Sequence, residues 1–139
     1  GSGVTVYLHN HNHGSVPSTG EQVLRLVNEL NNPGLSYVLD TGQFQGSPGA
    51  SGEGSPSNMA QVELYESIDM CAPIASMVRA KFYFAQSGPE RWLDYPRIVK
   101  SLKKSRFDGP ISIVYEPKGT VPSTDALPLA VRYLIDLLR

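Results

Sequence analysis

Four short runs rich in β-branched and aromatic residues alternate along the chain with four segments of helical spacing. The runs cover residues 4–8, 35–40, 77–84 and 111–115, and the helical segments begin near residues 18–19, 58, 95 and 124. Strict alternation of this kind favours parallel strands joined by right-handed helical crossovers. Two architectures satisfy it: an open four-stranded sheet with helices on both faces, or part of an eight-stranded barrel. Periodicity alone does not separate them.

Capping signals support two of the helices. Ser18 with Glu21, and Thr19 with Gln22, each fit a capping box at the start of the first helix. Asp94 fits the N-cap position of the third helix. These signals place helix starts where the apolar periodicity also begins.

The length of 139 residues suits a single domain over residues 1–139. We interpret residues 1–3 (Gly-Ser-Gly) as a cloning remnant, and residues 42–57, rich in Gly, Ser and Pro, as a flexible loop. A net charge of −1 without a basic patch disfavours nucleic acid as a partner. No apolar run approaches the roughly 20 residues that span a bilayer, so a membrane is not expected either. The single cysteine, Cys71, excludes an intrachain disulfide, and a reducing, cytoplasmic location is expected.

Residues that carry chemistry stand at the end of each strand run. The carboxyl ends of neighbouring parallel strands lie at one edge of a sheet, so these side chains are expected to converge. They comprise His9, His11 and His13 after the first run, Asp40 and Gln43 after the second, Arg79 and Lys81 within the third, and Glu116 after the fourth.

Several of these residues admit more than one role. The three alternating histidines could bind zinc, line a pocket or only satisfy a turn. Arg79 and Lys81 share a strand face, where they could bind a phosphate or carboxylate, or form an ion-pair network with Asp40 and Glu116. Glu116 could be a general base or a partner of Lys81. Trp92, in the loop after the third run, could stack on a sugar ring or anchor that loop.

Four segments in order carry a resemblance to a known family. They are LHNHNHG at residues 8–14, LDTGQ at 39–43, VRAK at 78–81 and DGPISIVYE at 108–116. This series resembles strands five to eight of the xylose isomerase-like TIM barrels, the sugar phosphate isomerase/epimerase superfamily. The resemblance covers nearly the whole chain. It implies an α/β fold of four consecutive strand–helix units that form the C-terminal half of a TIM (β/α)8 barrel.

The resemblance also implies a divalent metal, manganese, magnesium or zinc, at the C-terminal mouth of the barrel. In the family pattern a Glu, an Asp, a His and a Glu from strands five to eight hold the metal. The corresponding residues here are His9, Asp40, Arg79 and Val114, so only Asp40 matches. Hard divalent ions prefer carboxylate oxygens. Asp40 and His9 remain as candidate ligands, and we expect the metal site to be degenerate and the metal to be absent.

The implied function is that of half a sugar isomerase or epimerase, acting on a small polyhydroxylated sugar or sugar phosphate. The alternatives are a non-catalytic sugar-binding module or pseudoenzyme, and a structural fragment that self-associates. The candidate catalytic residues are Asp40, Glu116 and Lys81, and the candidate substrate-binding residues are His11, His13, Gln43, Arg79 and Trp92.

Half a barrel has consequences for activity and assembly. It supplies only half of a pocket, so the isolated chain is expected to be inactive. It also leaves two sheet edges open, and proteins usually pair or cover such edges. We therefore expect a homodimer, or completion by an N-terminal half-barrel.

Overall fold

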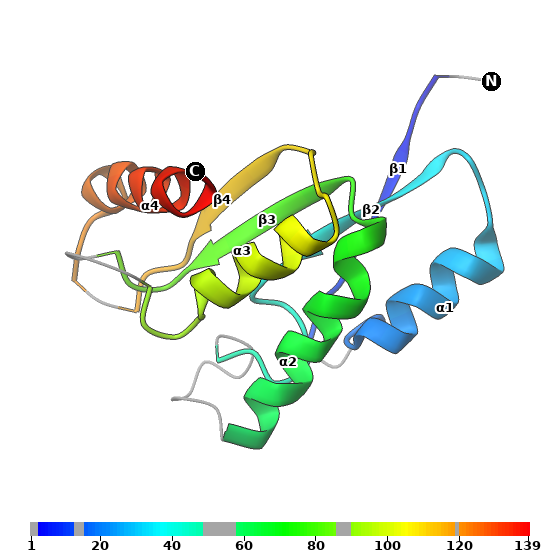
Figure 1. The fold of residues 1–139 in the computed structure, drawn as a ribbon, viewed down its shortest axis with the longest axis horizontal. Coiled ribbons are helices and arrows are strands. Elements are labelled where there is room, and N and C mark those ends of the chain that lie inside the picture. Colours follow the sequence, from blue (N-terminus) through cyan, green and yellow to red (C-terminus); the bar gives the residue numbers. More distant parts are fainter. Residues whose placement is uncertain (1–2, 13–15, 49–57, 86–89, 119) are drawn as a thin grey trace.

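The computed structural model describes residues 3–12, 16–48, 58–85, 90–118 and 120–139 (Figure 1). None of the helices in these ranges has the length and apolar character needed to cross a membrane. In chain order the elements are β1 (Val6–His9), α1 (Gly20–Leu30), β2 (Leu35–Asp40), α2 (Asn58–Cys71), the short 3-10 helix η1 (Ala72–Ile74), β3 (Met77–Phe82), α3 (Tyr95–Lys104), β4 (Ile111–Tyr115) and α4 (Ser123–Leu138).

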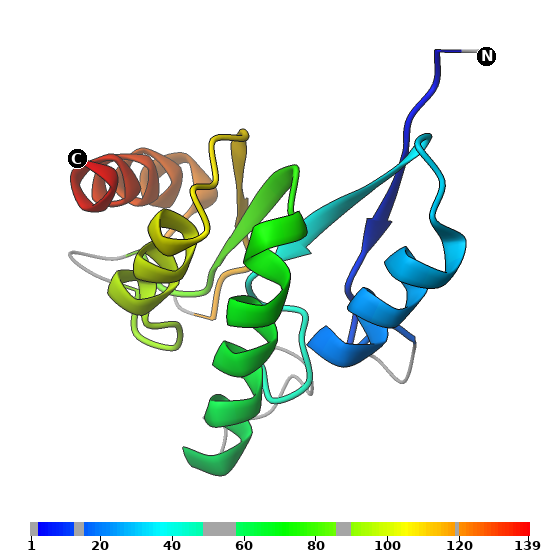
Figure 2. The same cartoon turned by 45° about the vertical axis from the view of Figure 1, so that its right-hand side comes forward.

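The four strands form one parallel sheet in the order β1-β2-β3-β4. Helices α1 to α4 lie along the same face of this sheet, and successive helices contact one another in chain order (Figures 1 and 2). A doubly wound open sheet would carry helices on both faces. The arrangement is therefore that of consecutive barrel units, which resolves the choice that periodicity leaves open.

The period of two along each strand separates an apolar face from a polar one. Tyr37, Leu39, Val78, Ala80 and Phe82 are all buried and belong to the core between sheet and helices. The intervening positions turn to the opposite face, which faces the interior of a barrel. The same alternation of side chains therefore supplies the apolar core on one face of the sheet and the polar strand-end residues on the other.

Three predicted boundaries differ from the structure. β1 covers residues 6–9 rather than 4–8, because Val6 is the first residue to pair, through the carbonyl of Gly34. β3 ends at residue 82 rather than 84, because the carboxylate of Glu90 accepts the next two backbone N–H groups. The last helix begins at Ser123, one residue before the predicted start.

The predicted helix caps are largely confirmed. Thr19 is the N-cap of α1 and forms a complete capping box with Gln22. The alternative box of Ser18 with Glu21 is wrong, because the helix starts one residue later than that box requires. Asp94 caps α3 by accepting a first-turn N–H at 3.1 Å.

The two ends of the sheet expose large apolar side chains. Val6 of β1 is 62% exposed, and Val4 and Tyr7 beside it are also exposed. A hollow of 340 Å³ lies at this edge between β1, β2 and the end of α1. At the other end, α4 exposes Leu127, Leu129, Val131, Ile135 and Leu138. Apolar surface at both ends is what half a barrel leaves uncovered.

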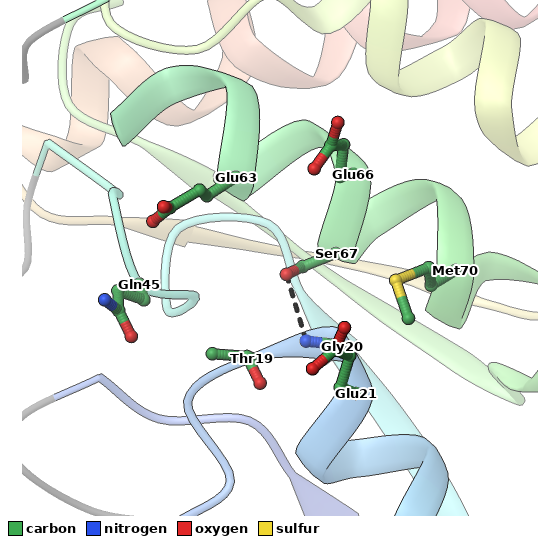
Figure 3. Close-up of a pocket in the computed structure, with 8 residues that line it drawn as sticks. All are labelled: Thr19, Gly20, Glu21, Gln45, Glu63, Glu66, Ser67 and Met70. Carbon is green, nitrogen blue, oxygen red and sulfur yellow. Dashed lines mark hydrogen bonds between the residues drawn. The ribbon is translucent and has the colours of Figure 1, made fainter. Parts of the chain in front are cut away.

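Helices α1 and α2 approach each other most closely at Gly20. Its backbone N–H donates to Ser67 Oγ at 2.9 Å, as Figure 3 shows. A Cβ atom at this position would lie 2.8 Å from the Cα of Ser67, closer than real contacts allow.

Gly20→Ala is therefore expected to lower the free energy of unfolding by about 1–3 kcal/mol, because the helices must move apart. Urea denaturation would measure the change. Gly34→Ala is the matched control, since a Cβ there meets only the flexible side chain of Asn32. Equal losses in the two variants would contradict this account of helix packing.

Candidate functional site

Asp40 ends β2, and the side-chain amide of Asn10 holds its backbone in place. Asn10 Nδ2 donates to the Asp40 carbonyl at 2.9 Å, and the Asp40 N–H donates to Asn10 Oδ1 at 2.9 Å. The hydroxyl of Tyr37 donates to the same Oδ1 at 2.7 Å. The amide of Asn10 thus continues the β1–β2 ladder by one residue after β1 has ended. The sequence analysis missed Asn10, whose only local signal is a polar residue directly after a strand.

The carboxylate of Asp40 is completely buried and surrounded by nitrogen atoms. Oδ1 accepts the backbone N–H of Gly42 at 2.9 Å. Oδ2 lies 3.2 Å from His9 Nε2, 3.6 Å from Arg79 Nε and 3.8 Å from Lys81 Nζ. A buried charge is tolerated only with partners of this kind. We call His9, Asp40, Arg79, Lys81 and Glu116 the strand-end cluster.

Lys81 is a buried cation that joins two carboxylates. Its Nζ lies 2.5 Å from Glu116 Oε1 and 3.8 Å from Asp40 Oδ2. A Cβ atom on Gly42 would lie 2.5 Å from Lys81 Cγ, so only glycine leaves room for this side chain. Thr41 Oγ1 fixes the backbone by accepting the Lys81 N–H at 2.9 Å. The predicted ion-pair network of Arg79 and Lys81 with Asp40 and Glu116 is confirmed.

Arg79 contacts both candidate metal ligands at once. Its Nη1 lies 3.0 Å from His9 Nε2, while its Nε faces Asp40. A guanidinium can only donate hydrogen bonds and a carboxylate can only accept them, so His9 Nε2, which lies near both Arg79 and Asp40, can serve only one of the two at a time. The register explains the proximity, because Asp40 and Arg79 are directly paired residues of β2 and β3.

This donor set does not fit a divalent metal. Among the residues that the structure describes, no three His, Cys, Asp or Glu side chains are grouped so that they could hold one. The two candidate ligands, His9 and Asp40, are already bound to Arg79. Two unit charges about 4 Å apart interact by about 4 kcal/mol at an effective dielectric constant of about 20, and a divalent ion doubles this repulsion. A divalent metal ion beside Asp40 would be repelled in this way by both Arg79 and Lys81.

His11 and Gln43 lie near the cluster. The ring of His11 is 6.3 Å from that of His9 and tilted by 52°. His13, predicted to bind substrate, lies outside the described residues. Gln43 follows the turn after Asp40 and is 7% exposed, and its Oε1 has no hydrogen-bond partner. A buried acceptor without a partner is costly.

Trp92 is set apart from the strand-end cluster. Its ring centroid lies 5.1 Å from those of both Tyr83 and Phe84. Tyr83 links this aromatic group to the site, because its hydroxyl donates to the Gly42 carbonyl at 3.3 Å. Burial raises the pKa of Tyr83 to about 12, so the hydroxyl keeps its proton. These contacts support the interpretation of Trp92 as a loop anchor.

Glu90 is a second residue that the sequence analysis missed. Its buried carboxylate accepts the backbone N–H groups of Tyr83 at 2.7 Å, Phe84 at 2.8 Å and Trp92 at 2.9 Å. Burial raises the pKa of Glu90, while these backbone hydrogen bonds oppose the rise. Glu90 therefore shapes the exit of β3.

A separate hollow of 250 Å³ lies between the start of α1 and the side of α2 (Figure 3). No residue of the strand-end cluster lines it. It lies among the helices, next to the start of α1 and the loop that follows β2. Its lining residues are Thr19, Gly20, Glu21, Gln45, Glu63, Glu66, Ser67 and Met70.

Parallel strands in chain order, helices on one face and polar side chains at the carboxyl edge define a segment of a (β/α) barrel. The sequence also matches the family described as Xylose isomerase-like TIM barrel over residues 1–137. The chain belongs to this family, as the strand-end motifs predict.

Solved structures agree on the fold. A D-psicose 3-epimerase from Clostridium cellulolyticum H10, solved with D-tagatose, matches with a TM-score of 0.62 at 10% identity, over 96% of this chain and 49% of that one. A 3-keto-D-glucoside 4-epimerase from E. coli matches with a TM-score of 0.63 at 14% identity, over 94% and 46%. A comparison with curated proteins gives no match. The chain spans about half the length of these structures, and its fold is half of a TIM barrel.

Asn10→Ala is expected to lower the free energy of unfolding by about 2–4 kcal/mol, because it removes three hydrogen bonds and leaves buried partners unsatisfied. Chemical denaturation would measure the loss. Asn28→Ala, on the exposed side of α1, should change stability by less than about 0.5 kcal/mol. A small effect at Asn10 would show that its amide does not hold the end of β2.

Proposed function

We propose that this chain is half of a sugar isomerase or epimerase-like barrel that acts on a small polyhydroxylated substrate. The supporting observation is the convergence of Asp40, Lys81 and Glu116, from three strands, at the carboxyl edge of the sheet. Active sites of TIM-barrel enzymes lie at this edge. The structural relatives named above are sugar epimerases, which supports a sugar as substrate.

The exposures of the three candidate catalytic residues suggest different roles. Glu116 is 47% exposed, so its carboxylate can reach a ligand and serve as the base that removes a proton beside a carbonyl group. Lys81 is buried against it and orients that carboxylate. Asp40 lies beneath both, with each of its oxygens engaged, and positions the cations around it.

The candidate substrate-binding residues surround these groups in the proposal. The proposal assigns Gln43, next to Asp40, to ligand binding, and the partly exposed Arg79 offers N–H donors to ligand oxygens. His11, whose ring lies near that of His9, completes the proposed set. Trp92 is left out of it because its contacts are those of a loop anchor. The substrate class includes free sugars and sugar phosphates, and we propose a cytoplasmic location and a single half-barrel domain over residues 1–139.

Two other functions stay open. A sugar-binding pseudoenzyme is favoured by the cations that surround the candidate metal ligands His9 and Asp40. A structural fragment that self-associates is favoured by the apolar surfaces at both ends of the sheet. In either case the isolated chain is expected to show little or no turnover.

Glu116→Gln is expected to weaken binding of D-tagatose or L-ribulose about tenfold, because a hydrogen bond to an ionised carboxylate is lost. Titration followed by saturation-transfer NMR would measure the dissociation constants. Glu29→Gln, which alters only an exposed pair with Arg25, serves as the control. Binding of neither sugar by the unmodified chain, or equal affinities in both variants, would contradict the proposed sugar site.

The open edges lead us to propose that two copies complete each other, with β4 of one chain beside β1 of the other. An N-terminal half-barrel supplied from elsewhere is the alternative partner. Size-exclusion chromatography with light scattering should give the mass of a dimer at micromolar concentration. Val6→Lys should shift the mass toward the monomer, whereas Val62→Lys on α2, where Val62 is 50% exposed, should not. A stable monomer of the unmodified chain would contradict the homodimer.

A further inference from the structure

Both candidate metal ligands of the strand-end cluster are directed at the same guanidinium. Arg79 Nη1 lies 3.0 Å from His9 Nε2, and Arg79 Nε lies 3.6 Å from Asp40 Oδ2. We propose that Arg79 takes the place of the divalent metal, so that the site binds the oxygen atoms of a polyhydroxylated ligand through a built-in cation. This inference deepens the proposed function and rests on it.

The charges of the cluster balance without a metal. Arg79 and Lys81 supply two positive charges, and Asp40 and Glu116 supply two negative ones. Lys81 is fully buried, and its Nζ lies 3.8 Å from Asp40 Oδ2 and 2.5 Å from Glu116 Oε1. The cluster therefore has no uncompensated negative charge that a divalent ion could neutralise. Such an ion would also be repelled by the two cations that lie close to the buried carboxylate of Asp40.

The guanidinium keeps hydrogen-bonding capacity for a ligand. It carries five N–H donors in a rigid plane, and the contacts with His9 and Asp40 use those on Nη1 and Nε. The side chain of Arg79 is 37% exposed, so part of it is accessible to a ligand. Two parallel donors match a pair of neighbouring oxygen atoms, such as a carbonyl and an adjacent hydroxyl, or a carboxylate.

Strand pairing holds this arrangement in place. Arg79 lies opposite Asp40 of β2 on one side and Ser112 of β4 on the other. Strand pairing therefore places the guanidinium beside Asp40, and His9 at the end of β1 is its second contact. A cation held by three strands is preorganised in the way that a ligand site requires.

Manganese alone is the probe for the test. Isothermal titration of the complete, metal-stripped chain with Mn²⁺ is expected to show no site that depends on Asp40. Arg79→His, which removes the fixed charge and adds a ligand, should bind Mn²⁺ at least about tenfold more tightly than the unmodified chain. Adding Asp40→Asn to that variant should abolish the gain.

Two results would overturn the proposal. One is Mn²⁺ binding by the unmodified chain that Asp40→Asn removes, and the other is a folded Arg79→His variant without tighter binding. Circular dichroism and thermal melting would establish folding. If Arg79→His does not fold, Arg79→Gln decides, because it removes the charge without adding a ligand and must also raise Mn²⁺ affinity.

A sugar arm separates this proposal from the proposed function. If D-tagatose binding to the unmodified chain survives excess EDTA, the site is metal-independent, as we infer. If EDTA abolishes the binding, Arg79 does not replace a metal, although the sugar function itself stands. Arg79→Ala should weaken the EDTA-resistant binding about tenfold, and an unchanged affinity would remove Arg79 from the ligand site.

Discussion

The carboxylate of Asp40 is shielded completely from solvent, and the ends of the neighbouring strands are arranged around its charge. An ion in the protein interior costs several kcal/mol unless charges and N–H groups compensate it. Here the compensation comes from the backbone N–H of Gly42 in its own turn and from Arg79 and Lys81 of β3. The charge network therefore ties the strands together, and residues suited to chemistry also contribute to the stability of the sheet.

The same alternation of side chains produces both the core and the incompleteness of the molecule. One set of strand positions packs beneath the helices, and the other set faces what would be the interior of a barrel. In a closed barrel the second set is covered by the opposite strands. In this chain Asp40 and Lys81 of this set are buried, whereas the side chain of Arg79 is 37% exposed. Val6 of β1 and Ile135 of α4 are exposed as well. A sheet that is well packed on one face only is thus poised to associate.

Much of the site could be predicted from the sequence, because parallel alternation and strand-end positions are local properties. They are sufficient to bring Asp40, Arg79 and Glu116 to one edge and to pair their charges. Asn10 and Glu90 could not be found in this way. Their side chains replace missing backbone partners, and that role depends on where strands stop in three dimensions rather than on residue spacing. The predicted end of β3 was wrong for the same reason.

This chain departs from the family pattern that the resemblance implies at three strand ends. The departures are consistent with one another when the net charges of the two sets of side chains are compared. The pattern of three carboxylates and one histidine, with a divalent ion, carries one net negative charge. The corresponding positions here hold one carboxylate, one guanidinium and two uncharged side chains, His9 and Val114, and their charges cancel. Loss of the carboxylates alone would leave a metal weakly held, and gain of Arg79 alone would leave it repelled. Because both changes occur together and Arg79 contacts His9 and Asp40, we infer that the site keeps a positive charge beside these two residues. In this inference the guanidinium of Arg79 binds ligand oxygens by hydrogen bonds where a metal ion would coordinate them, and the fold does not have to change.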